Sequence, residues 1–349
     1  MLIGSVQLVD FRNYQTLSYR PDPRTNLLTG RNAQGKTNLL EALAVLLTGR
    51  SFRTTRLADL PRWGSEAAGV SGELQRLEGT RTVRRTIQRR ETGIWHTTGE
   101  GCPWARVIAF GWQDLAILNG PPVARRSFID GFAARLFSSH VPALLKYRRL
   151  IEQRNRLLQV RAPIDRLAPW DEQLAVAGME LIDRRRRAVA ALQTEIARVY
   201  PAVAAQHLKV QVTYRSAIGE ATEPAALVAA LERARAEEMR RGLTVVGPHR
   251  DDLAIELDGM DARMFGSRGQ QRLLALALRL AEVLPVTEAA GTAPVLLLDD
   301  ALSELDPDVR SNVLQEIQSA EQVFLTSPEP LTVSGAARWV VDAGGIVAA

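Results

Sequence analysis

The chain has 349 residues, of which 46% are hydrophobic and 24% are charged, which excludes a disordered or fibrous protein and predicts one or two globular domains. Its net charge is +5, but residues 121–244 carry 21 Lys+Arg against 13 Asp+Glu, so the positive charge is concentrated in the middle third. The longest apolar runs are too short to span a bilayer, so no membrane segment is expected.

Residues 1–118 have the pattern of a mixed α/β domain. Short apolar stretches at residues 4–11 and 26–28 predict strands. Residues 36–48 predict a helix that is apolar on nearly every side, and such a helix is expected to lie buried in a core.

Residues 119–245 differ, because strand-like runs become rare and long helical patterns appear. Between residues 174 and 199, apolar side chains recur mostly at three- and four-residue spacing, as on one face of a long helix. Pro201 is expected to end or bend this helix. We therefore expect a helical arm domain, inserted into the surrounding α/β domain.

The α/β character returns in residues 246–349. Residues 270–283 predict an amphipathic helix, and the apolar runs 294–298 and 322–326 predict interior strands. Asp306 and Pro307 suit the N-cap and first turn of a helix through Ile317. The expected organisation is an α/β head built from both chain ends, 1–118 and 246–349.

The segment GRNAQGKT at residues 30–37 matches the pattern G-x-x-x-x-G-K-[ST] between a predicted strand and a predicted helix. In such a loop, backbone N–H groups point at phosphate oxygens, the lysine reaches the β- and γ-phosphates, and the threonine hydroxyl ligates Mg²⁺. The chain keeps only three lysines among its 44 basic residues, and one is Lys36, where a compact ammonium is needed and a planar guanidinium does not fit. The expected nucleotide-binding residues of this loop are Gly30, Arg31, Asn32, Ala33, Gln34, Gly35, Lys36, Thr37 and Asn38.

A second motif, APVLLLDD at residues 293–300, is an apolar strand that ends in two carboxylates. We expect Asp299 to hold Mg²⁺ through water, and Asp300 to orient or deprotonate the attacking water as a catalytic residue beside Lys36. An acidic strand alone is a weak signal. Together with the glycine loop it indicates an ATP-binding site.

The distance between these motifs narrows the class. Lys36 and Asp299 are 263 residues apart, which leaves room for a large insertion. The ATP-binding-cassette and SMC-like heads are similar in this respect, and they carry a Ser-Gly-Gln signature at the start of the helix before the acidic strand. Here the signature corresponds to Ser267, Gly269 and Gln270 in FGSRGQQR. A helix N-terminus with a hydroxyl and an unobstructed glycine suits a phosphate.

Together these motifs resemble the RecF family of SMC-like DNA recombination and repair ATPases, and the match runs through most of the chain. The segments that carry it are FRNY at 11–14, LLEAL at 39–43, GRSFRTTR at 49–56, GPPVARRSFID at 120–130, YRRLIEQRNRLL at 147–158, WDEQLAVAGMELI at 170–182, GPHRDDL at 247–253, SRGQQR at 267–272 and LLLDDALSELD at 296–306. The central segments matter most, because generic ATPases lack them.

The resemblance implies a function. It implies an ATPase head that binds ATP and Mg²⁺ and forms a homodimer with two nucleotides between the copies, each meeting the signature of the other copy. It also implies binding to duplex DNA or to single-strand/double-strand junctions, slow hydrolysis linked to release, and partnership with the RecR and RecO mediators, which load recombinase at gaps.

The basic middle third suggests DNA contacts. A solvated helix face is the alternative, especially for the run 184–187, because one helical turn points four side chains in different directions. The candidate DNA-binding residues are Arg125, Arg126, Arg148, Arg149, Arg154, Arg184 and Arg185.

The sequence departs from the patterns of the related ATPases in three respects. Trp112 and Gln113 stand where the family usually shows a proline and an acid, and Gln113 resembles the glutamine that contacts Mg²⁺ in cassette ATPases, so it is expected to have a catalytic and metal role. Asp300 stands where transporter-type heads have glutamate, consistent with slow turnover. The strand at 322–326 is followed by Ser327, with no histidine to sense the γ-phosphate.

Other functions could also use these motifs. A transporter's ATP-hydrolysing subunit is the main alternative, and a scaffold with an inactive nucleotide site is another. His249-Arg250-Asp251 matches a kinase triplet, but the Asn and the DFG motif that a kinase needs are missing, and a metal site there would have no second histidine nearby.

The location of the protein is expected to be cytoplasmic. The N-terminal segment has no secretory pattern, and a single cysteine, Cys102, cannot form an internal disulfide.

Overall fold

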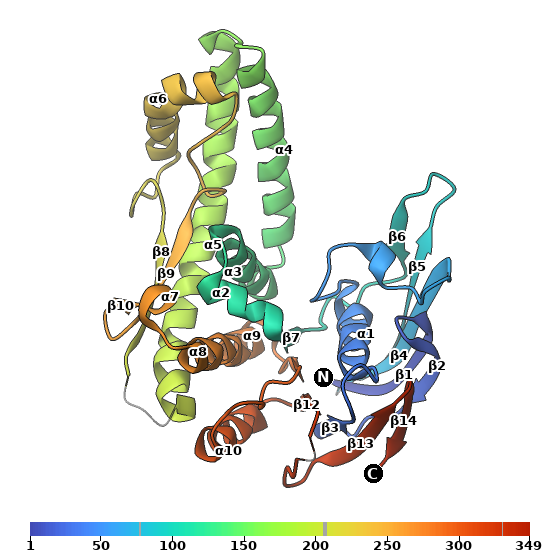
Figure 1. Ribbon diagram of the computed structural model, residues 1–349. Helices are drawn as coiled ribbons and strands as arrows, with labels where there is room; N and C mark the ends of the chain where they lie inside the picture. Colours follow the sequence, from blue (N-terminus) through green and yellow to red (C-terminus); the bar gives the residue numbers. More distant parts are fainter. Residues whose placement is uncertain (77, 205–207, 330) are drawn as a thin grey trace. The chain divides into compact units, whose positions relative to one another are not determined.

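The computed structural model describes residues 1–76, 78–204, 208–329 and 331–349 (Figure 1). The chain divides into two compact units. Unit 1 comprises Met1–Leu115, Ala202–Gln206 and Arg272–Ala349, and unit 2 comprises Ala116–Pro201 and His207–Gln271.

The described residues of unit 1 form two sheets. The first has the order β14-β13-β3-β12-β11-β7 and is parallel except for β14. Its strands are β3 (Thr25–Thr29), β7 (Val107–Phe110), β11 (Val295–Leu298), β12 (Gln322–Ser327), β13 (Ala337–Asp342) and β14 (Gly345–Ala348). The second sheet is antiparallel, in the order β2-β1-β4-β5-β6. Its strands are β1 (Leu2–Phe11), β2 (Tyr14–Tyr19), β4 (Ala67–Arg76), β5 (Gly79–Arg89) and β6 (Trp95–Thr98).

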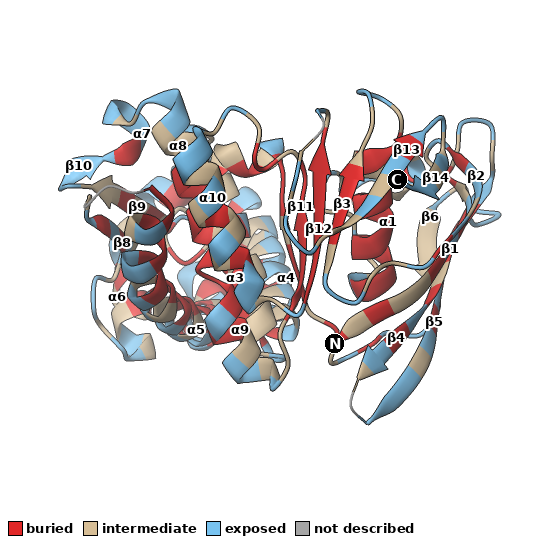
Figure 2. Cartoon of the chain, turned by 90° about the horizontal axis from the view of Figure 1, so that it is seen from below, coloured by how far each residue is buried: buried red, intermediate tan, exposed pale blue. Residues whose placement is uncertain are grey.

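Helix α1 (Lys36–Thr48) lies in the core of unit 1 and contacts strands of both sheets. Figure 2 shows α1 and the strands β3, β11 and β12 as largely buried. Residues 39–47 of α1 are all buried, as the apolar pattern predicts. The remaining helices of unit 1 are most of α8 (Arg268–Leu280), α9 (Val283–Ala290), α10 (Pro307–Glu316) and the short 3₁₀ helices η1 (Leu57–Asp59), η2 (Trp112–Leu115) and η3 (Ile317–Ser319).

Unit 2 is mainly helical. Its helices are α2 (Ala116–Asn119), α3 (Pro122–Leu136), α4 (His140–Gln159), α5 (Ile164–Ala204, which continues three residues past the unit boundary), α6 (Pro224–Arg241) and α7 (Ala262–Phe265). A small antiparallel sheet, in the order β10-β9-β8, is formed by β8 (Val210–Arg215), β9 (Asp252–Leu257) and β10 (Met260–Asp261). Buried apolar side chains of α4, α5 and α6, including Tyr147, Leu181 and Leu231, form its core.

Most elements expected from the sequence are present, with three differences. Helix α5 continues past Pro201 to Ala204. The helix expected at 270–283 ends at Leu280, and α9 begins at Val283, which places Pro285 in a first turn, where its missing N–H costs little. Residues 246–271, expected to belong to the head, cluster with unit 2, where β9 pairs with β8.

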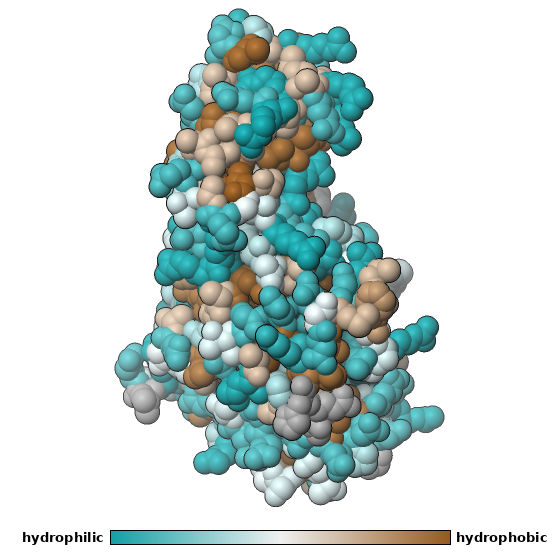
Figure 3. Space-filling view, turned by 90° about the vertical axis from the view of Figure 1, so that its left-hand side faces the viewer, coloured by the Kyte–Doolittle hydropathy of each residue, from teal (hydrophilic) through white to brown (hydrophobic). Residues whose placement is uncertain are grey.

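The surface is largely polar where it can be seen. The face in Figure 3 is mostly hydrophilic, and its hydrophobic side chains lie in small separate groups. Among the helices that the structure describes, none has a stretch long and apolar enough to cross a membrane.

Candidate functional site

The loop between β3 and α1 needs glycine at two positions. Gly30 has φ +146°, and a Cβ there would lie 2.2 Å from the carbonyl oxygen of Val341. Gly35 has φ +121°, and its Cβ would lie 2.7 Å and 2.8 Å from side-chain atoms of Asn13 and Tyr14. Any larger residue would therefore meet both backbone strain and a steric clash. These contacts explain the two fixed glycines of the sequence pattern.

The turn between β1 and β2 holds the loop in place. The Tyr14 hydroxyl donates to the carbonyl of Gly35 at 3.0 Å, and the Asn13 amide donates to the carbonyl of Gln34 at 2.9 Å. The side chain of Asn38 in turn donates to Asn13 at 2.8 Å. Sequence reasoning missed this role, although the FRNY segment at 11–14 that carries the family resemblance contains both residues.

Lys36 is directed along the loop. Its ammonium donates to the carbonyl oxygens of Gly30 at 2.5 Å and Arg31 at 2.9 Å, and its side chain is buried. Burial lowers the pKa of Lys36, and the negative charges of Asp299 and Asp300 oppose that shift. The ammonium is thus held by neutral acceptors beside two carboxylates, an arrangement that suits a phosphate and its metal ion.

Thr37 and Asp299 meet although they are far apart in the sequence. The Thr37 hydroxyl donates to Asp299 Oδ1 at 2.8 Å, and the Thr326 hydroxyl donates to the same oxygen at 2.9 Å. Burial raises the pKa of Asp299, and the hydrogen bonds from both threonines oppose the rise. A hydroxyl and a carboxylate this close are the ligand types that Mg²⁺ takes together with water and phosphate oxygens.

Asp300 follows directly and is held by its backbone. It has φ +54°, its N–H donates to the Thr326 hydroxyl at 2.8 Å, and its carbonyl accepts from Arg272 at 2.6 Å. Its carboxylate accepts a hydrogen bond from the Ser303 hydroxyl. The backbone contacts fix the position from which this carboxylate can reach a water.

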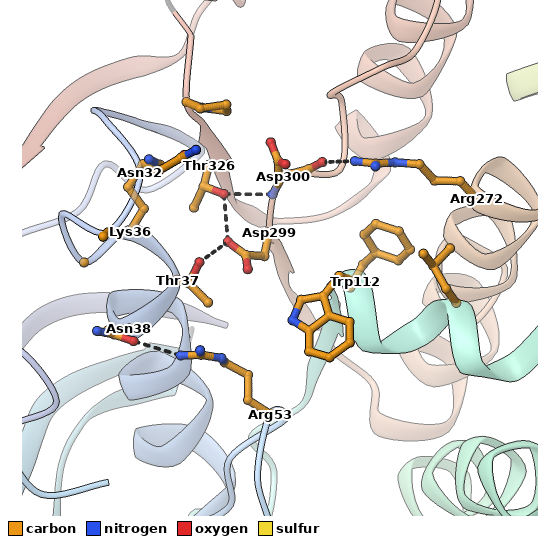
Figure 4. Close-up of a pocket in the computed structure, with 15 residues that line it drawn as sticks. Asn32, Lys36, Thr37, Asn38, Arg53, Trp112, Arg272, Asp299, Asp300 and Thr326 are labelled. Carbon is orange, nitrogen blue, oxygen red and sulfur yellow. Dashed lines mark hydrogen bonds between the residues drawn. The ribbon is translucent and has the colours of Figure 1, made fainter. Parts of the chain in front are cut away.

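These groups line one cavity of about 520 Å³ within unit 1 (Figure 4). Its lining residues are Asn32, Ala33, Gly35, Lys36, Thr37, Asn38, Arg53, Phe110, Trp112, Leu115, Arg272, Asp299, Asp300, Thr326 and Pro328. The volume is in the range of pockets that bind a nucleotide-sized ligand. The structure therefore brings together the glycine loop and the acidic strand that we paired from the sequence.

The neighbourhood of Gln113 differs from the expectation. Of the described residues, those that line the cavity include Trp112 but not Gln113. The Gln113 side chain lies over Gly111. Its amide atoms are 2.8 Å from the position that a Cβ on Gly111 would take. In this structure Gln113 is thus not brought to the metal-binding position, and Trp112 is one of the lining residues that the sequence did not predict.

The signature segment begins α8 with reciprocal hydrogen bonds. The N–H of Gln270 donates to the Ser267 hydroxyl at 3.2 Å, and the N–H of Ser267 donates to the Gln270 side chain at 2.9 Å. This is a capping box, which leaves the helix N-terminus ordered and its outer face free. A Cβ at Gly269 would meet no atom within 4 Å. The segment therefore presents an open, exposed surface.

For three of the arginines expected to contact DNA, the structure contradicts the prediction. Their side chains are buried in ion pairs within unit 2. Arg125 pairs with Asp252, Arg154 with Asp171 and Glu238, and Arg185 with Asp130. Buried and neutralised guanidinium groups brace a fold and leave no surface for a phosphate. Of the other candidates, Arg126 donates to the carbonyl of Asp251, Arg184 pairs with Glu180, and Arg148 and Arg149 are exposed.

The segment around His249 has a structural role. The His249 ring contacts the Tyr147 hydroxyl at 3.0 Å and the carbonyl of Thr244 at 3.0 Å. Asp251 accepts a hydrogen bond from Tyr214 at 2.6 Å. Within the described part of the chain, no group of three or more His, Cys, Asp and Glu side chains is arranged to hold a metal ion. The kinase and metal-site alternatives thus gain no support here.

Comparison with known proteins shows the family. The model of the RecF/RecN/SMC N-terminal domain matches residues 2–341. A protein of Symbiobacterium thermophilum named DNA replication and repair protein RecF is 38% identical, covering 93% of this chain and 91% of the relative. A protein of the same name from Desulforudis audaxviator is 37% identical, covering 99% of each.

Solved structures agree. The recombination mediator protein RecF with ATP, described as part of the RecFOR pathway, superimposes with a TM-score of 0.89 at 26% identity, covering 99% of each chain. An Smc head bound to the C-winged helix domain of ScpA has a TM-score of 0.58 at 14% identity, covering 100% of this chain and 98% of that one, and it shares the fold alone. The head fold expected from the sequence is therefore confirmed, and the chain belongs to the RecF family of SMC-like ATPases.

Proposed function

We propose that this chain is an ATP-dependent DNA replication and repair protein, which binds MgATP in the cavity of unit 1 and forms a homodimer on DNA. The observation that carries the proposal is the convergence of Lys36 and Thr37 with Asp299 around that cavity, in a chain of the RecF family. Duplex DNA and single-strand/double-strand junctions in gapped DNA are the proposed substrates, with slow hydrolysis linked to release.

The residues of the cavity have separate roles in binding and hydrolysing ATP. The loop from Gly30 to Thr37 offers backbone N–H groups to phosphate oxygens, and Lys36 neutralises the outer phosphates. Thr37 and Asp299 fit Mg²⁺, which when bound offsets the charge of the β- and γ-phosphates. Asp300 orients the attacking water or accepts its proton. For Gln113 to contact the metal ion, its side chain must turn from Gly111 toward the cavity.

The partners follow from the relatives. The RecF structure with ATP is described within the RecFOR pathway, which supports RecR and RecO as partners of this chain in loading recombinase at gaps. Of the candidate arginines, Arg148 and Arg149 are exposed and are the ones that we propose to contact DNA. The proposed location is the cytoplasm. The named relatives are DNA replication and repair proteins, which favours this function over a transporter subunit.

The test measures ATP hydrolysis and sedimentation mass together, with and without gapped duplex DNA. We expect a monomer that becomes a dimer with ATP and a slow ATPase that DNA stimulates. Ser267→Arg should bind ATP but remain monomeric, because a bulky cation replaces the hydroxyl that meets the second copy's nucleotide. Ser138→Arg, at an exposed serine outside the signature, is the matched control. A normal dimer of Ser267→Arg would reject the shared site, and ATP binding without any hydrolysis would indicate the scaffold.

A further inference from the structure

The signature of unit 2 is preceded by a group of exposed apolar side chains. Met260, Met264 and Phe265 are 49%, 71% and 65% exposed, within six residues of the chain. Solvated large apolar side chains gathered this densely are typical of surfaces that a partner covers. Elsewhere in the described part of unit 2, exposed side chains such as Val160 and Ile164 stand apart from any nucleotide motif.

This apolar segment is firmly joined to the signature. The side-chain amide of Gln271 donates to the carbonyls of Ala262 at 3.2 Å and Arg263 at 3.1 Å. The N–H of Gly266 donates to the carbonyl of Ala262 at 3.2 Å. Helix α7 is thereby held against the first turn of α8, where Ser267 lies. Whatever approaches the signature therefore also meets Met264 and Phe265.

In unit 1, an exposed aromatic side chain stands at the nucleotide cavity. Trp112 lines the cavity and is 75% exposed. Figure 4 shows its indole on the side of the cavity where Asp299 and Arg53 lie. The short helix η2 that carries it is fixed, because Asp114 accepts from the N–H of Gly111 at 2.8 Å and from Arg279 at 2.6 Å. The indole is thus presented beside the carboxylate that would hold the metal ion.

We propose that, in the ATP-bound pair, Met264 and Phe265 of one copy pack against Trp112 of the other copy. The inference rests on the proposed pairing, which brings the signature of one copy to the outer phosphate in the cavity of the other. Each face alone leaves large apolar surfaces in water, and their contact removes both from solvent.

The first experiment measures the dimer dissociation constant of the full chain by sedimentation equilibrium with Mg²⁺ and a slowly hydrolysed ATP analogue. Removing one buried aromatic side chain from a contact is worth on the order of ten-fold or more in affinity. We expect about that weakening for Phe265→Ala and for Trp112→Ala. The double variant should have about the same dimer dissociation constant as the weaker-binding single variant, because both substitutions remove the same contact.

Matched controls are Trp63→Ala and Val160→Ala, at exposed apolar positions outside the cavity and the signature. They should change the dissociation constant less than about two-fold, as surface substitutions usually do. Nucleotide affinity of Phe265→Ala is measured below the dimerisation range and should equal that of the unmodified chain. Strictly multiplicative effects of the two substitutions, or none, would overturn the contact.

A second measurement does not depend on dimer stability. At concentrations where the pair is fully formed, the nucleotide should shift tryptophan emission to the blue and reduce acrylamide quenching, and Trp112→Phe should lose most of both changes. An equal change in Trp112→Phe would overturn the contact. If the unmodified chain stayed monomeric with the nucleotide, the proposed function would fail as well. If only Ser267→Arg prevented pairing, the pairing would stand and this inference alone would fail.

Discussion

Two buried cations, one in each unit, are held in opposite ways. Lys36 in unit 1 donates to the neutral carbonyls of Gly30 and Arg31. Arg154 in unit 2 has no exposed surface and donates to Asp171 at 2.6 Å and Glu238 at 2.6 Å. The charge of Arg154 is balanced by two carboxylates of its own unit, whereas the charge of Lys36 is available to a ligand. The type of partner, and not burial itself, separates a binding cation from a bracing one.

The largest effect is expected for Arg154, the cation that is paired within its own unit. Arg154→Met should lower the free energy of unfolding by about 3–5 kcal/mol, because the buried carboxylate of Glu238 loses its guanidinium partner and Asp171 is left with Arg235. Urea denaturation followed by circular dichroism measures this. Arg156→Met, at an exposed position of the same helix, should stay within about 0.5 kcal/mol. If Arg154→Met proved as stable as the unmodified chain, the distinction between the two cations would not hold.

The binding side is tested by Lys36→Arg. The planar guanidinium cannot take the place of the ammonium between the loop carbonyls and a phosphate, so ATP hydrolysis should fall by about 10²-fold or more. The free energy of unfolding should change little, because the hydrogen bonds of Lys36 go to the backbone carbonyls of Gly30 and Arg31 and not to carboxylates. The control is Lys146→Arg, at an exposed lysine of unit 2. Unchanged turnover of Lys36→Arg would discard the assignment of residues 30–37 as a phosphate-binding loop.

A smaller effect is expected where the loop meets the turn that holds it. Gly35→Ala places a Cβ 2.7 Å from Asn13 and 2.8 Å from Tyr14 at a positive φ, which should cost about 1–3 kcal/mol and weaken ATP binding. Isothermal titration with ATP and thermal unfolding measure the two effects. Gly64→Ala, at φ +84° with no atom within 4 Å, isolates the backbone strain. Equal losses in both variants would show that the contact with the turn is unimportant.

The smallest effect depends on pH. Burial lowers the pKa of His249 to about 4, below its usual 6.5. Between these values the unfolded chain binds a proton that the folded chain does not, so stability should fall as the pH drops from about 6.5 to about 4. At pH 6 the loss is about 1 kcal/mol. Urea midpoints at pH 7.5 and 6 measure it, and His249→Gln should flatten the difference.

Another group titrates in a separate range. Although burial favours its neutral form, hydrogen bonds from His140 and Arg185 lower the pKa of Asp130 to about 2. Its contribution is present above its ordinary pKa of 3.8 and is lost only as the pH falls toward about 2. A loss of stability between pH 7.5 and 6 that persisted in His249→Gln would therefore point to groups other than these two.

The phosphate-binding loop could be predicted from the sequence because its signals are local. The glycine spacing, the strand before it and the apolar helix after it are read from one short segment, and α1 begins at Lys36 as predicted. That the loop lies beside Asp299 could also be inferred, since the loop and the two aspartates each follow an apolar strand. The structure shows this as the Thr37–Asp299 hydrogen bond, which joins residues 262 positions apart. Parallel strands bring such carboxyl-terminal ends to one edge of a sheet.

Sequence reasoning failed where the outcome depends on packing between distant segments. Arg185 and Arg187 lie in one run of four arginines, yet Arg185 is buried against Asp130 and Arg187 is exposed. Only the position of α3 beside α5 decides this. The antiparallel strands β4 and β5 were also missed, because the arginines of β5 interrupt its alternating pattern. The choice between Trp112 and Gln113 at the cavity is set by the η2 turn.

The phosphate loop is held by residues that are made much later than the loop itself. The N–H groups of Ala343 and Gly344 donate to Gln34, and the carbonyl of Val341 faces Gly30. At about 5–20 residues per second, a ribosome needs on the order of tens of seconds to reach the second group after the first. A nascent chain therefore carries a complete glycine motif for most of its synthesis without the support that shapes it. Nucleotide binding is expected to begin only once the turn after β13 has emerged, so chains that stop short of it remain outside the ATP cycle.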